Sequence, residues 1–306
     1  WHRIYLSAEN RDFSKPRIPM IGRVERHLHN TLLEFQPDLV ASTYPLYPYF
    51  LERSFRNGVP RCPVVTIITD SFTINAAWRN APSDYWLVTD PGTRQSLLDQ
   101  ELPEGRVIET GFPVHPRFST LDPVPADDPA KPLRVLFFPT SKKPTVRRIA
   151  KAVLNHDAWP TEITIVLGRN VRKLYKRARE IKQAYPGRVR IKGWTGKVPE
   201  LLCSQHLLVG KAGGATVHEA LAARCPMLIH HLVPGQEAGN LELLRKIGGG
   251  DLADTPESIA AAIRDLTADQ AARWRRQKRN LSRHARPNAS ATAARFLLDT
   301  ISAQHP

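Results

Sequence analysis

Cysteine, long apolar runs and metal-binding patterns are scarce or missing in this chain of 306 residues. Its three cysteines, Cys62, Cys203 and Cys225, are widely spaced and form no metal or redox pattern. No apolar run approaches the roughly 20 residues that a membrane-spanning helix needs. The sequence therefore predicts a reduced, cytoplasmic protein that has no metal site and does not cross a membrane.

Acidic residues are also few. The chain has 44 lysines and arginines but only 29 aspartates and glutamates, which gives a net charge of +15. Such an excess attracts an anionic partner: nucleic acid, an anionic membrane surface or an acidic substrate. Nucleic-acid binding would need interleaved aromatic residues or a recognised module, and neither occurs, so no nucleic-acid partner is expected. For the basic predicted helices 171–185 and 270–286, an anionic membrane surface and an ordinary solvated face both stay open.

An initiating methionine and a signal segment are missing as well. The chain starts at Trp1, and no basic-then-apolar stretch precedes its first predicted helix. We expect a fragment whose true start lies upstream, and a first domain that is N-terminally incomplete.

What the sequence does contain is an alternation of short apolar strands and amphipathic helices, interrupted once. Four prolines within Leu121–Pro132 cannot continue a helix or a central strand, so this stretch is the expected linker. It separates a first domain (1–120) from a second (133–266), and the helical residues 267–306 could pack back on the first. Repeated βα units with short turns predict an α/β fold with parallel sheets and helices on both faces.

The most informative stretch is Lys211–Asn240, KAGGATVHEALAARCPMLIHHLVPGQEAGN. The preceding apolar run His206–Gly210 predicts a buried strand that enters a turn of small residues. Thr216 and Glu219 then have the spacing of a capping box at a helix start. The free N–H groups and the dipole of such a helix end can hold a phosphate, although an ordinary tight βα turn would have the same sequence.

A polar loop follows one βα unit later and contains Gln236, Glu237 and Asn240. Amide and carboxylate groups beside a phosphate site suit the hydroxyl groups of a polyol. The combination favours a nucleotide whose far end is a polyol over a plain turn.

In the first half, the β-branched run Pro63–Thr69 predicts a strand that ends at Asp70. Ligands collect at the carboxyl ends of strands in open α/β sheets, which makes Asp70 a candidate site residue. Capping of the next segment is the alternative role.

Together, the two α/β halves, the Pro-rich linker and the run KAGGATVHEA…PMLI…VPGQEAGN resemble the GT-B glycosyltransferases. Within them the chain is most similar to the monogalactosyldiacylglycerol synthase-like group, and more distantly to the lipid II-forming N-acetylglucosamine transferase. The run in this group is close to KAGPGTxxEAL…GxPxIL…PGQExGN, and Gln36–Asp38, Trp78 and Gly111–Val114 also match in order and spacing. The resemblance implies two Rossmann-like domains whose parallel sheets face each other across a cleft.

Carried over residue by residue, the resemblance implies a donor site for a UDP-sugar. The residues expected at the diphosphate are Gly213, Gly214, Ala215 and Thr216, and Glu219 is expected at the ribose. Gln236 and Glu237 are expected at the sugar, with Asn240 supporting them. The backbone around Gly193 and Trp194 is expected at the uracil. On the acceptor side the resemblance implies Asp70 and Trp78. No cofactor is implied, because a helix end can stabilise the leaving diphosphate without a metal.

Three departures from the family pattern limit what carries over. No Gly-rich turn ending in a histidine precedes residue 36, so the catalytic base is unknown and Asp70 is only a candidate for it. The Gly-rich turn expected after the first strand of the second domain is replaced by Pro139–Lys143. There Thr140 and Ser141 could still bind phosphate or could form an ordinary turn. Asn75–Trp78 keeps the tryptophan of a His-Pro-Thr-Trp-like run without its histidine, which leaves the acceptor open.

The expected function is inverting transfer of galactose or glucose from a UDP-sugar to a lipid acceptor such as diacylglycerol. The expected location is peripheral on the cytoplasmic side of a membrane with an anionic surface. A nucleotide-sugar epimerase or hydrolase is one alternative, because fold alone does not determine chemistry. A non-catalytic protein for UDP-sugar binding or membrane recruitment is another.

Overall fold

The computed structural model describes residues 22–126, 132–140, 143–235 and 237–304. The chain divides into two compact units. The first comprises Trp1–Pro113, Pro234–Gly239 and Ala289–Pro306, and the second comprises Val114–Val233 and Asn240–Asn288. The short segment Pro234–Gly239 therefore belongs to the first unit, although it follows a strand of the second.

The first unit is built on a parallel four-stranded sheet in the order β1-β2-β3-β4. Its strands are β1 (Val40–Ser42), β2 (Val64–Ile67), β3 (Tyr85–Val88) and β4 (Val107–Glu109). The two central strands consist mostly of β-branched, aromatic and aliphatic residues, as expected for strands that are covered on both faces.

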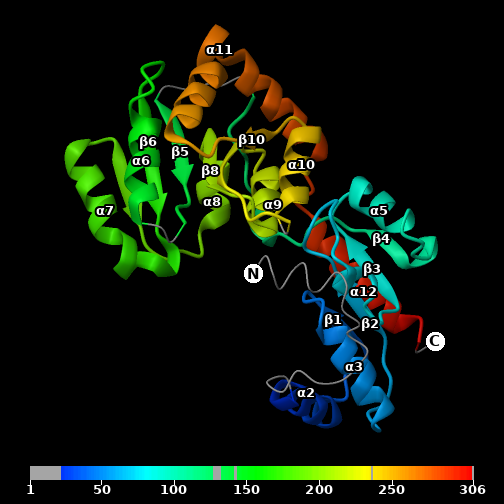
Figure 1. The fold of residues 1–306 in the computed structure, drawn as a ribbon. Coiled ribbons are helices and arrows are strands. Elements are labelled where there is room, and N and C mark those ends of the chain that lie inside the picture. Colours follow the sequence, from blue (N-terminus) through cyan, green and yellow to red (C-terminus); the bar gives the residue numbers. More distant parts are fainter. Residues whose placement is uncertain (1–21, 127–131, 141–142, 236, 305–306) are drawn as a thin grey trace. The chain divides into compact units, whose positions relative to one another are not determined.

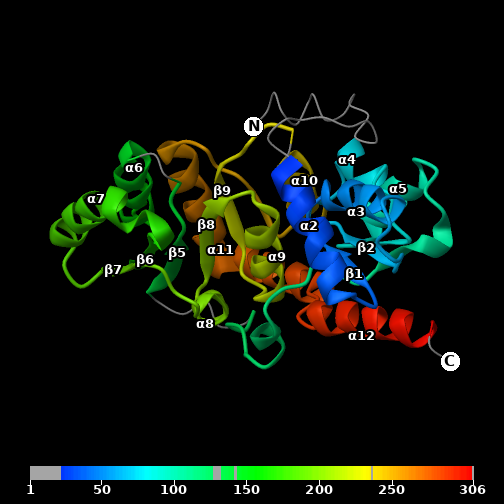
Figure 2. The same cartoon turned by 90° about the horizontal axis from the view of Figure 1, so that it is seen from below.

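Five α-helices accompany this sheet in the described part of the first unit. They are α2 (Gly22–Phe35), α3 (Tyr47–Arg56), α4 (Ala76–Arg79), α5 (Pro91–Leu98) and α12 (Ala289–Ser302). On one face, Val65 and Leu87 pack with Ala293 of α12, which runs along the sheet in both ribbon views (Figures 1 and 2). The other face packs against Trp78 and Leu97.

The second unit has a parallel six-stranded sheet in the order β10-β9-β8-β5-β6-β7. The strands are β5 (Leu133–Phe137), β6 (Thr161–Val166), β7 (Val189–Lys192), β8 (Leu207–Lys211), β9 (Met227–His231) and β10 (Gly250–Leu252). The chain builds outward from β5 to β7 and then returns to place β8 on the other side of β5. This reversal is the topological switch point at which open α/β sheets bind ligands.

Helices cover the second sheet and close its core. They are α6 (Lys143–Leu154), α7 (Val171–Ala184), α8 (Val198–Cys203), α9 (Gly214–Ala222), α10 (Ala238–Lys246) and α11 (Pro256–His284), with the short 3-10 turn η3 (Gly168–Asn170) before α7. The core collects apolar side chains from β5, β6, α6, α7 and α11. Helix α11 starts at a capping box of Thr255 and Ser258 and is interrupted by non-helical backbone at Ala268–Ala271.

Candidate functional site

The turn between β8 and α9 lies at the switch point of the second sheet. Helix α9 begins at Gly214, and its N-cap Gly213 has extended backbone angles (φ −69°, ψ 141°) without a side-chain cap. The first backbone bond of the helix runs from Val217 N–H to the Gly213 carbonyl at 3.0 Å. The N–H groups of Gly214, Ala215 and Thr216 precede that bond and have no acceptor among the described residues. Three free donors and the helix dipole can hold an anionic group here.

The capping box predicted for Thr216 and Glu219 is wrong. The helix starts two residues before Thr216, which places Glu219 in its second turn. The two consecutive glycines, Gly213 and Gly214, have no Cβ that restricts the backbone, so the chain enters the helix before it reaches a capping side chain. The helix end therefore has no side-chain acceptor among the residues that the structure describes, and the Glu219 carboxyl group is not used as a cap.

Glu219 is a half-buried carboxyl group with no hydrogen bond or ion pair among the described residues. Burial raises its pKa from the usual 4.5 to about 7. Withdrawing a carboxylate from water without giving it donors is unfavourable, so the chain carries this group at a cost in stability. Donors from a ligand, such as a pair of hydroxyl groups, would supply the hydrogen bonds that the protein does not.

Asn240 connects α10 to the same turn. Its side chain is 1% exposed, and Nδ2 donates to the carbonyl oxygen of Ala212 at 3.1 Å. Its Oδ1 is buried and has no hydrogen-bond partner in the described ranges. Asn240 therefore holds the residue before the glycine pair and keeps one acceptor available.

The loops after β5 and β7 lie at the same edge of the sheet, because all its strands are parallel. Thr140 follows β5 and is half-buried, whereas Ser141 lies outside the described residues. After β7, a Cβ on Gly193 would lie 3.2 Å from Cγ2 of Val171, and Trp194 is 69% exposed. Because β7 is three strands away from β8, the ends of these two strands are about 14 Å apart along the edge.

His230 is a buried residue of this edge that sequence reasoning missed. It lies in β9 and is 3% exposed. Its Nε2 is 3.2 Å from the carbonyl oxygen of Phe138. Its Nδ1 has no hydrogen-bond partner in the described part of the chain. Burial lowers its pKa and thereby favours the neutral ring. A neutral ring can donate from Nε2 to Phe138 and thereby hold the loop that leads to Thr140. The only signal in the sequence was a histidine inside the apolar run PMLIHH.

Asp70 lies just beyond β2 in the first unit and is half-buried. Trp78 Nε1 donates to its Oδ2 at 3.2 Å, and Trp86 Nε1 donates to the carbonyl oxygen of Trp78 at 3.0 Å. Burial raises the pKa of Asp70 from 3.8 to about 6, the Trp78 hydrogen bond lowers it, and the negative charge of Glu237 raises it. The N-cap of α4 is Asn75, so Asp70 does not cap that helix. A carboxylate with a raised pKa is a better proton acceptor near neutral pH than an ordinary one.

Gly239 packs on the segment that follows Asp70. A Cβ on Gly239 would overlap the carbonyl oxygen of Ser71 and would lie 2.8 Å from the nitrogen of Thr73, so only glycine fits. This close approach leaves Glu237 4% exposed and within electrostatic range of Asp70. Gln236 lies outside the described residues. Gly239 is part of the GQEAGN run, but nothing in that run indicates the contact that it makes.

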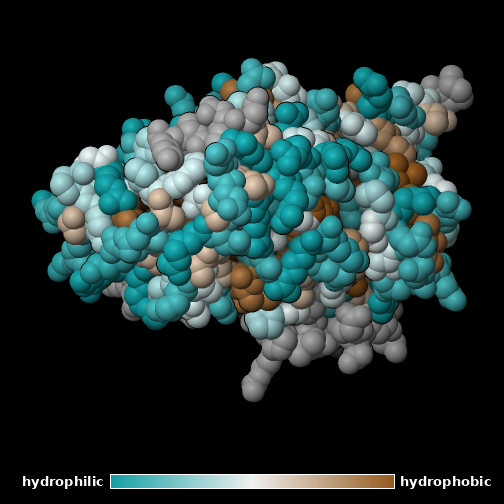
Figure 3. Space-filling model, turned by 90° about the horizontal axis from the view of Figure 1, so that it is seen from above, coloured by the Kyte–Doolittle hydropathy of each residue, from teal (hydrophilic) through white to brown (hydrophobic). Residues whose placement is uncertain are grey.

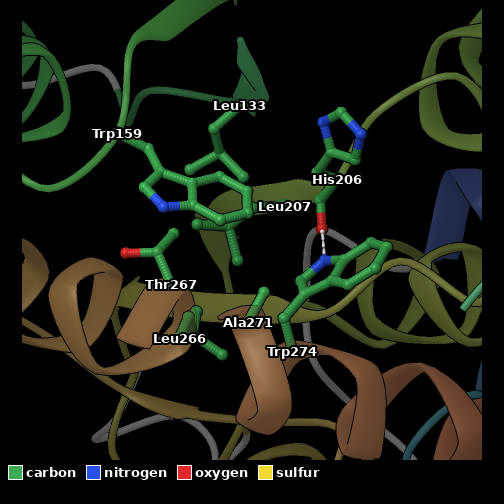
Figure 4. Close-up of a pocket in the computed structure, with 8 residues that line it drawn as sticks. All are labelled: Leu133, Trp159, His206, Leu207, Leu266, Thr267, Ala271 and Trp274. Atoms are coloured by element: carbon green, nitrogen blue, oxygen red, sulfur yellow. Dashed lines mark hydrogen bonds between the residues drawn. The ribbon is translucent and has the colours of Figure 1, made fainter. Parts of the chain in front are cut away.

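A small cavity in the second unit is a different feature (Figure 4). It is lined by Leu133, Trp159, His206, Leu207, Leu266, Thr267, Ala271 and Trp274. It lies where β5 and β8 begin, at the edge opposite the glycine pair, and Trp274 Nε1 donates to the carbonyl oxygen of His206 at 2.7 Å. Its mostly apolar lining beside the interrupted part of α11 identifies it as a gap in core packing.

Two other kinds of feature are not found in the described part of the chain. No group of three or more histidine, cysteine, aspartate or glutamate side chains could hold a metal ion there. None of the helices in these residues has both the length and the apolar content needed to cross a bilayer.

Comparison with known proteins finds relatives at the level of sequence. Residues 1–114 match the family described as Monogalactosyldiacylglycerol (MGDG) synthase. The chain is 30% identical over 256 residues to the processive diacylglycerol beta-glucosyltransferase of Staphylococcus carnosus (strain TM300), a match that covers 79% of this chain and 62% of that protein. It is 26% identical over 309 residues to the probable chloroplastic monogalactosyldiacylglycerol synthase of Glycine max, covering 94% of this chain and 57% of that protein. The chain thus spans about three fifths of the length of these relatives.

Solved structures agree at the level of fold. The crystal structure of Acinetobacter baumannii MurG gives a TM-score of 0.65 at 16% identity and covers 93% of this chain and 82% of that chain. The S. aureus MnaA–UDP co-structure gives a TM-score of 0.64 at 14% identity and covers 95% of this chain and 82% of that chain. The predicted α/β fold with two Rossmann-like units and parallel sheets is confirmed.

Proposed function

We propose that this chain, whose residues 1–114 match the monogalactosyldiacylglycerol synthase family, belongs to that group of GT-B glycosyltransferases and transfers a hexose from a UDP-sugar to a lipid acceptor. Diacylglycerol is the acceptor we favour, since both relatives described above are named for glycosylation of diacylglycerol or for synthesis of its galactolipid. A UDP co-structure of the same fold supports the choice of donor. The donor sugar is galactose or glucose.

The observation that carries this proposal is the uncapped start of α9 together with Glu219. Gly214, Ala215 and Thr216 offer free N–H groups to the diphosphate. Glu219 has no hydrogen-bond partner among the described residues and can accept hydrogen bonds from the ribose hydroxyls. Asn240 holds the turn through Ala212. The exposed face of Trp194 and the backbone at Gly193 are available to the uracil, and Thr140 can donate to a phosphate oxygen.

On the acceptor side, we assign the role of base to Asp70 and the role of positioning it to Trp78. Asp70 takes the proton of the acceptor hydroxyl while the hydroxyl oxygen attacks the anomeric carbon of the sugar. The bond from that carbon to the diphosphate breaks, its electron pair leaves with UDP, and the configuration inverts. Preorganised N–H donors of the kind found at the start of α9 stabilise the charge that develops on the diphosphate. Gln236 and Glu237 are assigned to the sugar hydroxyls.

If the acceptor is a membrane lipid, the transfer takes place at a membrane surface. We therefore propose that the protein acts peripherally on the cytoplasmic face of a membrane and is attracted there by its net charge of +15.

The test is product analysis with radiolabelled UDP-galactose and UDP-glucose, with and without diacylglycerol in detergent micelles. The expected result is a labelled glycolipid that forms only with diacylglycerol and has the anomeric configuration opposite to that of the donor. Release of free sugar without lipid would instead indicate a hydrolase, and an altered UDP-sugar would indicate an epimerase. Calorimetric binding of UDP without any product would indicate a binding protein.

A further inference from the structure

The positive charge of the protein is concentrated in one part of the second unit. Residues 143–197, which contain α6, α7 and β7, hold fifteen lysines and arginines and only three aspartates and glutamates. This segment accounts for most of the net charge of +15. The left end of Figure 3, which corresponds to the end with α6 and α7 in Figure 1, is predominantly hydrophilic.

Helix α7 presents this charge on its outer side. Its buried side chains, Leu174, Ala178 and Ile181, face the core of the unit. The opposite side carries five exposed cations, which we call the α7 basic face: Arg172, Lys173, Lys176, Arg179 and Lys182. At 1.5 Å per residue they form a stripe about 15 Å long. Tyr175 flanks this stripe and is 49% exposed.

The α7 basic face has no acidic side chain within ion-pair distance in the ranges that the structure describes. None of its five side chains forms an ion pair with a described residue, and the one ion pair of α7 joins Arg177 to Glu180. Like charges three and four residues apart on a helix repel each other. The cations of the α7 basic face therefore repel one another, and anions bound from outside the protein would reduce this repulsion.

The position of two of these cations at the start of α7 also indicates a role in binding an anionic partner. Helix α7 has no acidic residue in its first turn and instead has Arg172 and Lys173 there, at the positive end of the helix dipole. Helices α2 and α11 carry Glu25 and Glu257 in their first turns, whereas α3, α5, α9 and α12 resemble α7 in having no acid there. The arrangement in α7 opposes the stability of the helix, as expected when the charges serve to bind a partner.

We propose that the α7 basic face docks on the phosphate-rich headgroup layer of an anionic bilayer. The inference rests on the proposed function, which requires access to a membrane lipid. A straight stripe of cations fits a planar layer of phosphates, and its one exposed aromatic residue, Tyr175, has the amphipathic ring that is favoured at headgroup depth. The stripe offers no row of aromatic rings on which nucleic-acid bases could stack. Because the apolar side of α7 is buried in the core, the contact is electrostatic and weakens with salt.

The test uses a triple variant in the second half of the helix, Lys176→Gln, Arg179→Gln and Lys182→Gln, away from the contact of Val171 with the Gly193 loop. Glutamine is a good helix former, so the fold is retained. Binding is measured by co-sedimentation of the whole chain with phosphatidylcholine vesicles that do or do not contain phosphatidylglycerol. The wild type should bind only the anionic vesicles. The triple variant should bind them about 100-fold more weakly, at roughly fivefold per cation.

The matched control removes the same charge from α11 by Arg276→Gln, Arg279→Gln and Arg283→Gln. These exposed residues lie on a helix that is separated from α7 in both ribbon views (Figures 1 and 2). The control should bind anionic vesicles within a factor of about three of the wild type, because only its net charge changes.

Three results would overturn the inference: equal losses in both triple variants, wild-type binding that ignores phosphatidylglycerol, or binding to an RNA oligonucleotide but not to vesicles. UDP affinity measured by calorimetry should be unchanged in both variants. A wild type that fails to bind UDP while its α7 basic face still selects anionic vesicles would count against the proposed function and not against this surface.

Discussion

Replacing Glu219 with glutamine should stabilise the protein and weaken its binding of UDP at the same time. The carboxyl group is half-buried, has no hydrogen-bond partner among the described residues, and has its pKa raised by burial from 4.5 to about 7. A shift of that size corresponds to about 3 kcal/mol of unfavourable free energy for the ionised group in the folded state. Glutamine has nearly the same shape and no charge, so it removes most of this cost.

The gain should depend on pH in a defined direction. Below pH 4.5 the group is protonated in both the folded and the unfolded state, and the substitution should change little. Between 4.5 and 7 the unfolded chain releases the proton while the folded protein retains it, so the cost of the wild-type residue grows, and above 7 it is complete. The variant should therefore gain about 1 kcal/mol at pH 5 and about 3 kcal/mol at pH 8.

Urea unfolding at the two pH values measures the stability, and calorimetry measures UDP binding. Loss of a charge-assisted hydrogen bond to the ribose should weaken UDP affinity by roughly 10- to 100-fold. Glu242→Gln is the control, because Glu242 is an exposed residue of α10 that pairs with Lys246, and its removal should change both quantities little. A Glu219→Gln variant that is less stable at pH 8, or that binds UDP as tightly as the wild type, would refute the assignment.

Four further predictions concern the site and the basic helix. Ala215→Asp should abolish UDP binding in calorimetry by placing a negative charge among the free N–H groups, and should raise the melting temperature slightly, because an acid near a helix start adds about 0.5 kcal/mol; tight UDP binding by this variant would contradict the phosphate site. Asp70→Asn should lower kcat by more than about 100-fold and remove the acidic limb near pH 6 from the pH–rate profile, with UDP affinity unchanged; a retained limb would exclude Asp70 as the base. Gly239→Ala should cost about 1–3 kcal/mol in urea unfolding, since the new methyl group overlaps the carbonyl oxygen of Ser71; a neutral effect would mean that the two loops do not pack. Lys173→Glu should increase the free energy of unfolding by about 0.5 kcal/mol by correcting the charge at the start of α7, and a loss of stability would contradict the dipole argument.

The sequence by itself determined the architecture and the region of the site. Continuous β-branched and aliphatic runs such as Val64–Ile67 are readable as buried parallel strands because they are apolar on both faces. The small residues after β8 marked the turn that we assign to phosphate, because only a backbone without large side chains allows a ligand to approach it closely. These properties are local, and a linear pattern is enough to recognise them.

Tertiary structure decided what the local pattern could not express. The capping spacing of Thr216 and Glu219 was misleading, because the helix begins earlier, at the glycine pair. Glu219 is therefore not a cap but a carboxyl group without a hydrogen-bond partner in the described part of the chain. The proximity of Asp70 to Glu237 depends on the contact of Gly239 with Ser71, which joins segments more than 160 residues apart in the chain. Burial, and with it the raised pKa of Asp70 and Glu219, arises only when such distant segments exclude water together, so the chemistry of these carboxyl groups is a property of the folded chain.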